Sequence, residues 1–262
     1  MSDAWVVFAV LIVLLASSAP GVFLQGILKQ RHRSRDTIDA VRLVISILVT
    51  FTAFVLSLVT SSVKLSFDSF DTRLRVFAGD ITQLDTRLRE YGDDAMPIQM
   101  KLRAYVAAAI ADTWRNEPRP SGAYPTFADT VGIERQQLGA LLVDADVAIR
   151  RLEPPDSYHR QLANILQARM TDTLRQRQLL IETVHDTVSW PLLMGMTSWL
   201  AIVFAVFGLI APRNAVVYAT IILCALSFTS AFFILEFDKP LEGMIHVASD
   251  PMRDALRHLD AP

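Results

Sequence analysis

Four long stretches of apolar residues lie in two pairs along the chain, and a polar segment separates the pairs. None of the four contains Asp, Glu, Lys or Arg, and each is at least 21 residues long, whereas about 20 residues cross a hydrocarbon core as a helix. A soluble core has no need of four such stretches. The pattern therefore predicts an all-α integral membrane protein with four transmembrane helices, at Trp5–Leu28, Leu43–Val63, Pro191–Ala211 and Ala215–Leu235.

The first of these stretches is interpreted as a retained span rather than a cleaved signal peptide. It begins just after the acidic residue Asp3, whereas a signal peptide begins with basic residues, and its apolar residues continue beyond the small residues 16–19. Within it, Pro20 precedes Gly21, and this pair predicts a kink or a break in the helix.

Between the two pairs of spans, residues 64–190 predict a helical-bundle extramembrane domain. Apolar residues recur there at steps of three and four over more than three heptads, which is the pattern of helices packed along a common seam. Charged residues flank the seam and predict a wetted surface. The seam residues are Phe67, Phe70, Leu74, Phe77, Ile81, Leu84, Leu88 and Tyr91, and the flanking residues are Asp71, Arg73, Arg75, Asp80, Asp85, Arg87 and Arg89.

No proline separates the second span from this seam. We therefore expect one helix from about Ile38 to Tyr91, which would be roughly 80 Å long at about 1.5 Å per residue. Gly92 is suited to end it, because glycine accepts the left-handed backbone conformation of a helix C-cap.

Three further helices are expected in this domain. Asp93 or Asp94 can cap the first of them, and Pro97 suits its first turn. Helices joined by short turns predict an antiparallel bundle. The expected helices reach to about Trp114, then span about Ile133–Leu152 and about Ser157–Val188; the domains are a membrane pair in 1–63, the bundle in 64–190, a membrane pair in 191–235 and a polar C-terminal segment in 236–262.

Charge is distributed unevenly, although the chain is 52% hydrophobic and its net charge is only −2. The loop of residues 29–42 has five basic and two acidic residues, and the short loop Pro212-Arg213-Asn214 adds one basic residue. Basic short loops face the cytoplasm. We therefore expect a multi-pass protein of a bacterial inner membrane, with both termini and the central domain outside the cytoplasm.

Candidate chemistry is sparse. The one cysteine, Cys224, lies inside the fourth span, so it cannot form an internal disulfide and no zinc-ligand spacing exists. The histidines at positions 159, 185, 246 and 258 form no metal-ligand spacing, and the sequence has no phosphate loop or nucleophile elbow. We expect a protein that is not an enzyme and has no cofactor, no metal and no nucleic-acid partner.

The segment after the last apolar stretch carries the sharpest motif. It reads Leu235-Glu-Phe-Asp238-Lys-Pro240-Leu-Glu-Gly243-Met-Ile-His-Val247. The acidic residue, the proline and the glycine resemble the signature of the bestrophin-like family of bacterial membrane proteins. We expect Asp238, Pro240 and Gly243 to have a structural role, stopping the helix and allowing a turn.

Two further features are similar to that family: Tyr105 is followed by Trp114, and two spans lie on each side of a helical domain. Bestrophins proper are pentameric anion channels. The resemblance therefore implies a homo-oligomer, expected to be a pentamer, that passes small inorganic anions across the lipid bilayer.

Two features depart from bestrophins. No cluster of consecutive acidic residues resembles their calcium clasp, so calcium gating is not implied. Bestrophins also keep their helical domain and termini in the cytoplasm, whereas the basic short loops of this chain place them outside.

One face of the second span carries small and hydroxyl side chains at steps of four and three. In a pore wall, hydroxyls would donate hydrogen bonds to a partly dehydrated anion, and a lysine at the end would raise the local anion concentration. The same pattern is typical of close helix packing in membranes, and both interpretations stay open. The residues are Ser46, Thr50, Ala53, Ser57, Thr60 and Lys64.

Phe67 and Phe70 follow this face. In a ring of subunits they could form an apolar constriction that gates by dewetting, or they could be the first layer of the domain's own core. The leading hypothesis is a bestrophin-like anion-permeable channel whose pore is lined by the second helix. The alternative is a membrane-anchored helical scaffold or envelope sensor without a conducting path.

Overall fold

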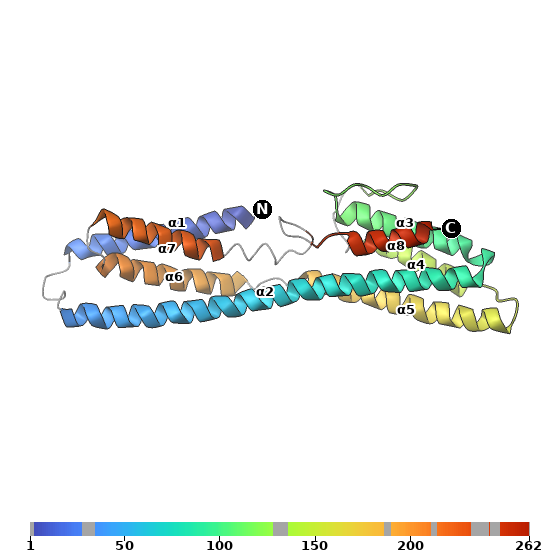
Figure 1. Cartoon of the computed structure of the whole chain (residues 1–262), viewed down its shortest axis with the longest axis horizontal. Helices are drawn as coiled ribbons and strands as arrows, with labels where there is room; N and C mark the ends of the chain where they lie inside the picture. The colour runs from blue at the N-terminus through green and yellow to red at the C-terminus, as the bar shows by residue number, and fades with distance from the viewer. Residues whose placement is uncertain are drawn as a thin grey trace. The chain divides into compact units, whose positions relative to one another are not determined.

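The computed structural model describes residues 3–27, 35–127, 136–185, 190–210, 214–231, 241 and 247–261. Every regular element in these ranges is helical (Figure 1), as the sequence predicts. The chain divides into two compact units. Unit 1 comprises Met1–Leu65 and Thr187–Lys239, and unit 2 comprises Ser66–Asp186 and Pro240–Pro262.

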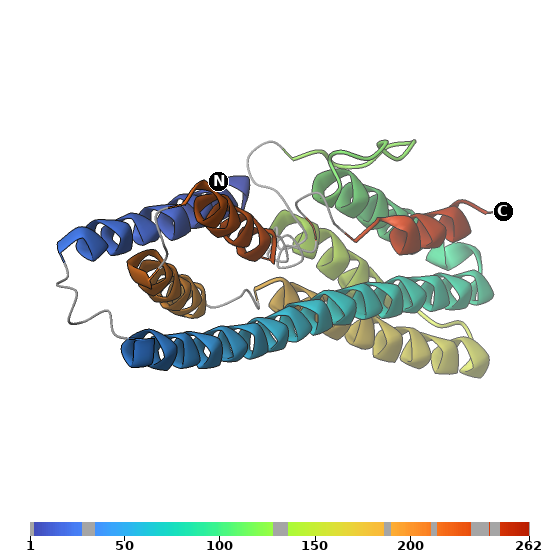
Figure 2. The same ribbon diagram turned by 60° about the vertical axis from the view of Figure 1, so that its left-hand side comes forward.

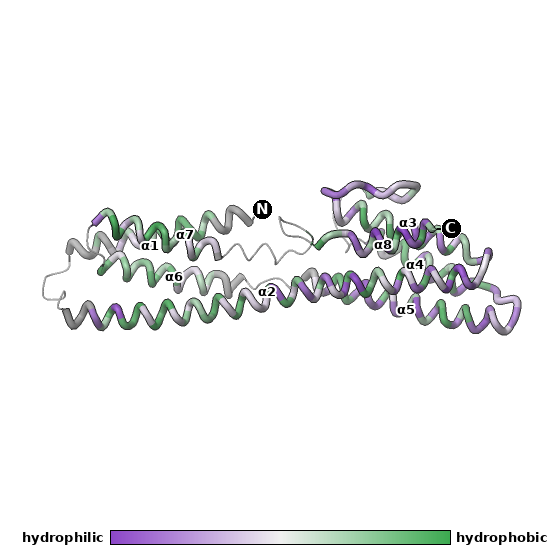
Figure 3. Tube along the Cα trace, viewed as in Figure 1, coloured by the Kyte–Doolittle hydropathy of each residue, from purple (hydrophilic) through white to green (hydrophobic). Residues whose placement is uncertain are grey.

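Unit 1 contains the apolar helices. These are α1 (Asp3–Ile27), α6 (Trp190–Ile210), α7 (Ala215–Ala231) and the first part of α2 (Arg35–Tyr91). Figure 3 shows that hydrophobic residues predominate along α1, α6 and α7, whereas polar and apolar residues alternate along the helices of unit 2. One buried cluster joins all four helices of unit 1 and includes Leu14 of α1, Val63 of α2, Leu200 of α6 and Ala225 of α7.

Two glycines bring α1 and α6 into close contact. A Cβ added to Gly21 would overlap the carbonyl oxygen of Ala205, and one added to Gly208 would overlap that of Ser18. The helix α1 is continuous through Pro20 and Gly21, so of the expected kink or break the break does not occur. Gly21 has no side chain because α6 occupies the space, and small residues are what allow such an approach.

The helix α2 has 57 residues and confirms the expectation of one long helix. It ends at Tyr91, and the next residue, Gly92, has φ 98°, a conformation that favours glycine. Both views of the ribbon show α2 as one uninterrupted helix (Figures 1 and 2). Its residues up to Leu65 belong to unit 1, and those from Ser66 belong to unit 2.

Unit 2 adds four helices to the second part of α2. They are α3 (Met96–Thr113), α4 (Gln136–Arg150), α5 (Ser157–His185) and α8 (Asp250–Asp260). The heptad seam is confirmed: Phe70, Leu74, Phe77, Ile81, Leu84, Leu88 and Tyr91 are all buried in the core of this unit, and Phe67 packs against it.

The expected capping by Asp93 or Asp94 is wrong. These residues form a short 3-10 helix, η2 (Asp93–Ala95), and Ala95 is the N-cap of α3 with no side-chain hydrogen bond. Pro97 does lie in the first turn of α3, as expected. The residues before Gln136 that were expected to begin the third helix lie outside the described residues, as do those after His185.

The C-terminal segment differs most from expectation. It was expected to be a polar extension, but α8 packs against the core of unit 2 through Met252, Ala255 and Leu256. This packing buries Asp85, which the sequence placed on the wetted flank of the seam. The sequence does contain the signal, because apolar residues at positions 252, 255, 256 and 259 follow the helical period.

The apolar helices differ in length. Within the described residues, one helix, Asp39–Tyr91, is long and apolar enough to cross a membrane, and Phe8–Gly21, Met194–Ile210 and Ala215–Ser230 form shorter apolar helices. The four-span count stays a prediction.

Candidate functional site

The predicted stripe on α2 lies on the surface of the chain. Ser46, Thr50, Ala53, Ser57 and Lys64 are exposed, and Thr60 is half-buried. Because an α-helix turns by about 100° per residue, all six lie within about 40° of one line along the helix. The structure therefore brings these residues together on one open face.

A different face of the same helix is buried in unit 1. Ile45, Thr52, Val59 and Val63 are each at most 9% exposed, and they lie roughly 115° around the helix from the stripe at about 100° per residue. Thr52 satisfies its hydroxyl within the helix, by donating to the carbonyl oxygen of Leu48 at 2.8 Å. The stripe is therefore not the face that packs against the chain's own helices.

Large apolar side chains occupy the remaining face. Ile47, Phe54, Leu58 and Leu65 are each more than half exposed. Near this face Phe51 stacks on Trp199 of α6, with ring centroids 4.9 Å apart. The helix α2 thus presents two open faces of different chemistry, one apolar enough for lipid and one lined by hydroxyls and small side chains.

Two hydroxyls of the stripe are bonded within the helix. Ser46 Oγ donates to the carbonyl oxygen of Arg42 at 3.0 Å, and Thr50 Oγ1 donates to that of Ser46 at 2.9 Å. A hydroxyl has one hydrogen and can rotate, so it can exchange this bond for one to a ligand. Such bonds are worth about 0.5–1.5 kcal/mol net, which an anion on the stripe would have to exceed.

The two phenylalanines beyond the stripe have different environments. Phe70 is fully buried in the core of unit 2, so it forms the first layer of that core and cannot line a constriction. Phe67 is half-buried and packs against the same core. The motif residues Asp238, Pro240 and Gly243 lie outside the described residues.

The two residues noted beside the motif are both core residues of unit 2. Tyr105 is fully buried, and this burial raises the pKa of its hydroxyl to about 12, so the phenol is neutral at physiological pH. Trp114 is also buried, and its indole Nε1 donates to the carbonyl oxygen of Val247 at 2.7 Å. Val247 is the last residue of the motif segment, so this bond ties that segment to α3.

No site for a metal ion is found in the part of the chain that the structure describes: no three His, Cys, Asp or Glu side chains are grouped there as metal ligands would be. The features that the structure does bring together are the open stripe on α2 and a polar cluster between α2 and α8. Spacing along the chain does not predict that cluster, because its residues come from two helices that are far apart in the sequence.

Comparison with known proteins places the fold in a class. The structure is similar to that of a bacterial bestrophin homologue from Klebsiella pneumoniae carrying a point substitution, with a TM-score of 0.62, 13% identity and 97% of each chain covered. A second variant of that homologue gives a TM-score of 0.61 at 13% identity, covering 99% of this chain and 97% of the other. A structure described as a membrane protein gives 0.56 at 13% identity, covering 99% and 98%. The fold is that of helical membrane proteins of the bestrophin class.

The family follows from the sequence itself. The family model described as a Bestrophin-like domain matches residues 8–252. The chain therefore belongs to the Bestrophin-like family, as the motif and the arrangement of apolar stretches predicted. No curated protein matches the chain.

Proposed function

We propose that this chain is the subunit of a homo-oligomeric, pentameric, anion-permeable channel in a bacterial inner membrane. The observation that carries the proposal is the open stripe on α2, Ser46, Thr50, Ala53, Ser57, Thr60 and Lys64, beside an equally open apolar face. Membership of the Bestrophin-like family supports it.

The stripe has the chemistry of an anion path. Its residues between positions 46 and 60 carry no charge, so a permeating anion would meet hydroxyl dipoles rather than a tight-binding cation. Conduction requires binding strong enough to admit the ion and weak enough to release it. Lys64 lies at one end, where its ammonium would attract anions to the mouth.

An apolar constriction is assigned to Phe67 alone. Its side chain is half-buried, and a ring of such side chains from neighbouring copies of the chain would gate by dewetting. Basic short loops support an orientation with both termini and unit 2 outside the cytoplasm.

The proposal is tested by stoichiometry and flux. The purified protein should form a ring with an axial path and pass chloride in liposomes. Lys64→Glu should lower anion flux relative to cation flux, by an amount that shrinks at high salt because mobile ions screen the mouth. Phe67→Ala should raise flux by widening and wetting the constriction.

The control lies on a different face of the same helix. Phe54→Leu, on the apolar face, should leave selectivity unchanged. A dimer without an axial path would instead support a membrane-anchored helical scaffold. If Lys64→Glu folds normally and changes neither flux nor selectivity, α2 does not line the path at that level.

A further inference from the structure

The helix α8 is attached at its start to the loop after α3. The amide of Ser249 donates to Glu117 Oε1 at 3.1 Å, and its hydroxyl donates to Glu117 Oε2. Arg253 adds a bond from Nε to the same Oε2 at 3.1 Å and one to the carbonyl oxygen of Pro118 at 2.7 Å. This part of the attachment is a cluster of charged hydrogen bonds.

The end of α8 is attached to α2. Arg89 donates to the carbonyl oxygens of His258 and Leu259, at 3.1 and 3.2 Å. These carbonyls belong to the last turn of α8, where a helix has spare acceptors; that of His258 also accepts from the amide of Ala261 at 3.2 Å. A guanidinium there also suits the partial negative charge of a helix C-terminus. Asp260 pairs in addition with Arg103 of α3.

A fully buried carboxylate lies under this end of the helix. Asp85 is 0% exposed; Arg89 Nε donates to its Oδ2 at 2.7 Å, while Oδ1 accepts no hydrogen bond. Burying a charged group with incomplete pairing is costly. Any further positive charge beside Asp85 would therefore stabilise the docked arrangement.

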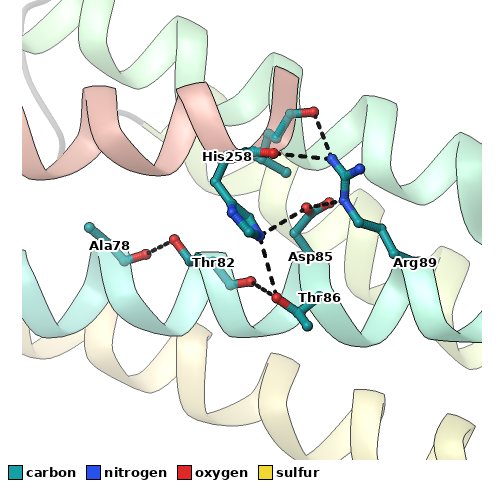
Figure 4. A network of polar contacts seen from close by, with 7 residues as sticks. Ala78, Thr82, Asp85, Thr86, Arg89 and His258 are labelled. Carbon is teal, nitrogen blue, oxygen red and sulfur yellow. Dashed lines mark hydrogen bonds and ion pairs between the residues drawn. The ribbon is translucent and has the colours of Figure 1, made fainter. Parts of the chain in front are cut away.

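His258 is the group that can supply this charge. Figure 4 shows His258 of α8 facing Asp85, Thr86 and Arg89 of α2. Its Nε2 lies 3.7 Å from Asp85 Oδ2 and 3.4 Å from Thr86 Oγ1. Asp85 is thus approached by one permanent cation, Arg89, and by one imidazole that is charged only when protonated.

The hydrogen-bond pattern fixes which nitrogen carries the proton. Thr86 Oγ1 donates its hydrogen to the carbonyl oxygen of Thr82 at 2.9 Å, so towards His258 it can only accept. Nε2 of the neutral ring must then be the protonated nitrogen. A second proton is added at Nδ1 and needs no rearrangement of the contacts with α2.

The surrounding charges do not cancel this effect. Near the end of α8, the other arginines of α8 and α3 in the described residues are each paired with an acidic residue. One turn away on α2, a further arginine is also paired with an acidic residue. Asp85 is left as the carboxylate with an unbonded oxygen. The pairs, from α8, α3 and α2, are Arg257 with Asp254, Asp260 with Arg103, and Arg87 with Glu90.

We propose that α8 is a pH-responsive strap, attached more firmly to α2 when His258 is protonated and more loosely when it is neutral. The docked state holds the imidazolium beside a buried carboxylate, whereas in the released state both groups are in water. Docking is therefore stronger at low pH, where the imidazole is protonated, and weakens as the pH rises and the imidazole loses its proton.

The test uses hydrogen–deuterium exchange of the full chain in nanodiscs, with protection of the α8 amides corrected for the intrinsic rate at each pH. Protection should be about two- to fivefold greater at about pH 5.5 than at about pH 8, the size expected for a partly exposed charge pair. His258→Gln should remove this dependence. Thr86→Val, which keeps Asp85 intact, should weaken it.

The control is a histidine–aspartate pair elsewhere in unit 2. His159 Nδ1 lies 2.8 Å from Asp156 Oδ1, so His159→Gln removes a similar pair without touching α8. It should leave the pH response of α8 unchanged. If protection of α8 responds to pH equally in the wild type and in His258→Gln, or rises with pH, the proposal is wrong. The experiment requires no conduction, so its outcome is independent of the proposed channel.

Discussion

One glycine on each helix, Gly21 of α1 and Gly208 of α6, sets how closely the two helices approach each other. Gly208→Ala places a methyl group against the backbone of Ser18, and backbone cannot move aside as a flexible side chain can. We expect this change to lower the melting temperature of the detergent-solubilised protein markedly, since overpacking a core costs about 1–3 kcal/mol.

The same helix provides the matched control. A Cβ added to Gly195 of α6 meets no atom within 4 Å, so Gly195→Ala should be tolerated or slightly stabilising. Equal melting temperatures for both variants would show that the glycine contact between α1 and α6 is not a tight one.

A second residue-scale prediction concerns acid. Burial raises the pKa of Glu117, but hydrogen bonds from Ser249 and Arg253 outweigh burial, and the pKa lies below its usual 4.5. A carboxyl with a lowered pKa contributes stability above its unperturbed pKa and loses it as the pH falls through the lowered value. Protection of α8 against hydrogen exchange should therefore fall in acid, below about pH 4.5.

Glu117→Gln should abolish that acid response, because the amide does not titrate. Glu153→Gln, at an exposed position in the turn between α4 and α5, should leave it intact. An acid response that persists in Glu117→Gln would assign it to another group.

At the scale of the element, the seam of α2 is the feature on which unit 2 depends. Leu74 and Ile81 are fully buried, so Leu74→Asp or Ile81→Asp buries an unpaired charge at a cost on the order of several kcal/mol. Unit 2 should lose its cooperative unfolding transition in a thermal-shift assay.

Charged residues on the flank of the same helix should behave differently. Arg75 Nε donates to Asp71 at 3.0 Å, but this i,i+4 pair is solvent-exposed on the arginine side, and water and salt screen such a pair so that it adds little stability. Asp71→Asn and Arg75→Gln should shift the melting temperature little. A comparable loss in both groups of variants would contradict the assignment of the seam.

How much of this could be read from the sequence depends on the kind of interaction. The seam and the end of α2 at Gly92 were predictable, because periodicity and backbone preference are local. The burial of Asp85 was not predictable, because it depends on contacts with α8 that are distant in the sequence. For example, His258 of α8 and Thr86, the neighbour of Asp85, are 172 residues apart along the chain. Pro20 and Gly21 predict a kink or a break from the sequence alone, because the sequence does not show that α6 lies against Gly21.

In the candidate site, too, the local features were predictable and those that depend on packing were not. The stripe on α2 follows from spacing alone, and five of its six residues are exposed in the structure. The environment of Phe70 does not follow from spacing, because pore-lining and core positions are both apolar and only packing distinguishes them. The flux experiment distinguishes a stripe that faces ions from one that packs against another helix.

At the scale of the whole molecule, orientation is open to a direct test. In a Cys224→Ser background, single cysteines at Ser34 and Ser121 lie in the basic loop and in the loop after α3. With an impermeant thiol reagent on intact cells, we expect labelling at Ser121→Cys and not at Ser34→Cys. Labelling at Ser34→Cys alone would establish the opposite orientation, that of bestrophins.

The attachment of α8 also bears on how the protein is made. A chain grows from its N-terminus, and contacts between distant residues must wait until the later partner has been synthesised. Arg89 is made 169 residues before His258, whose carbonyl it binds, and Trp114 is made 133 residues before Val247. During this interval Asp85 and the apolar surface under α8 are not covered by α8, so this part of the core of unit 2 stays exposed. A chaperone or protease that recognises exposed apolar segments would therefore encounter this surface during synthesis and not afterwards.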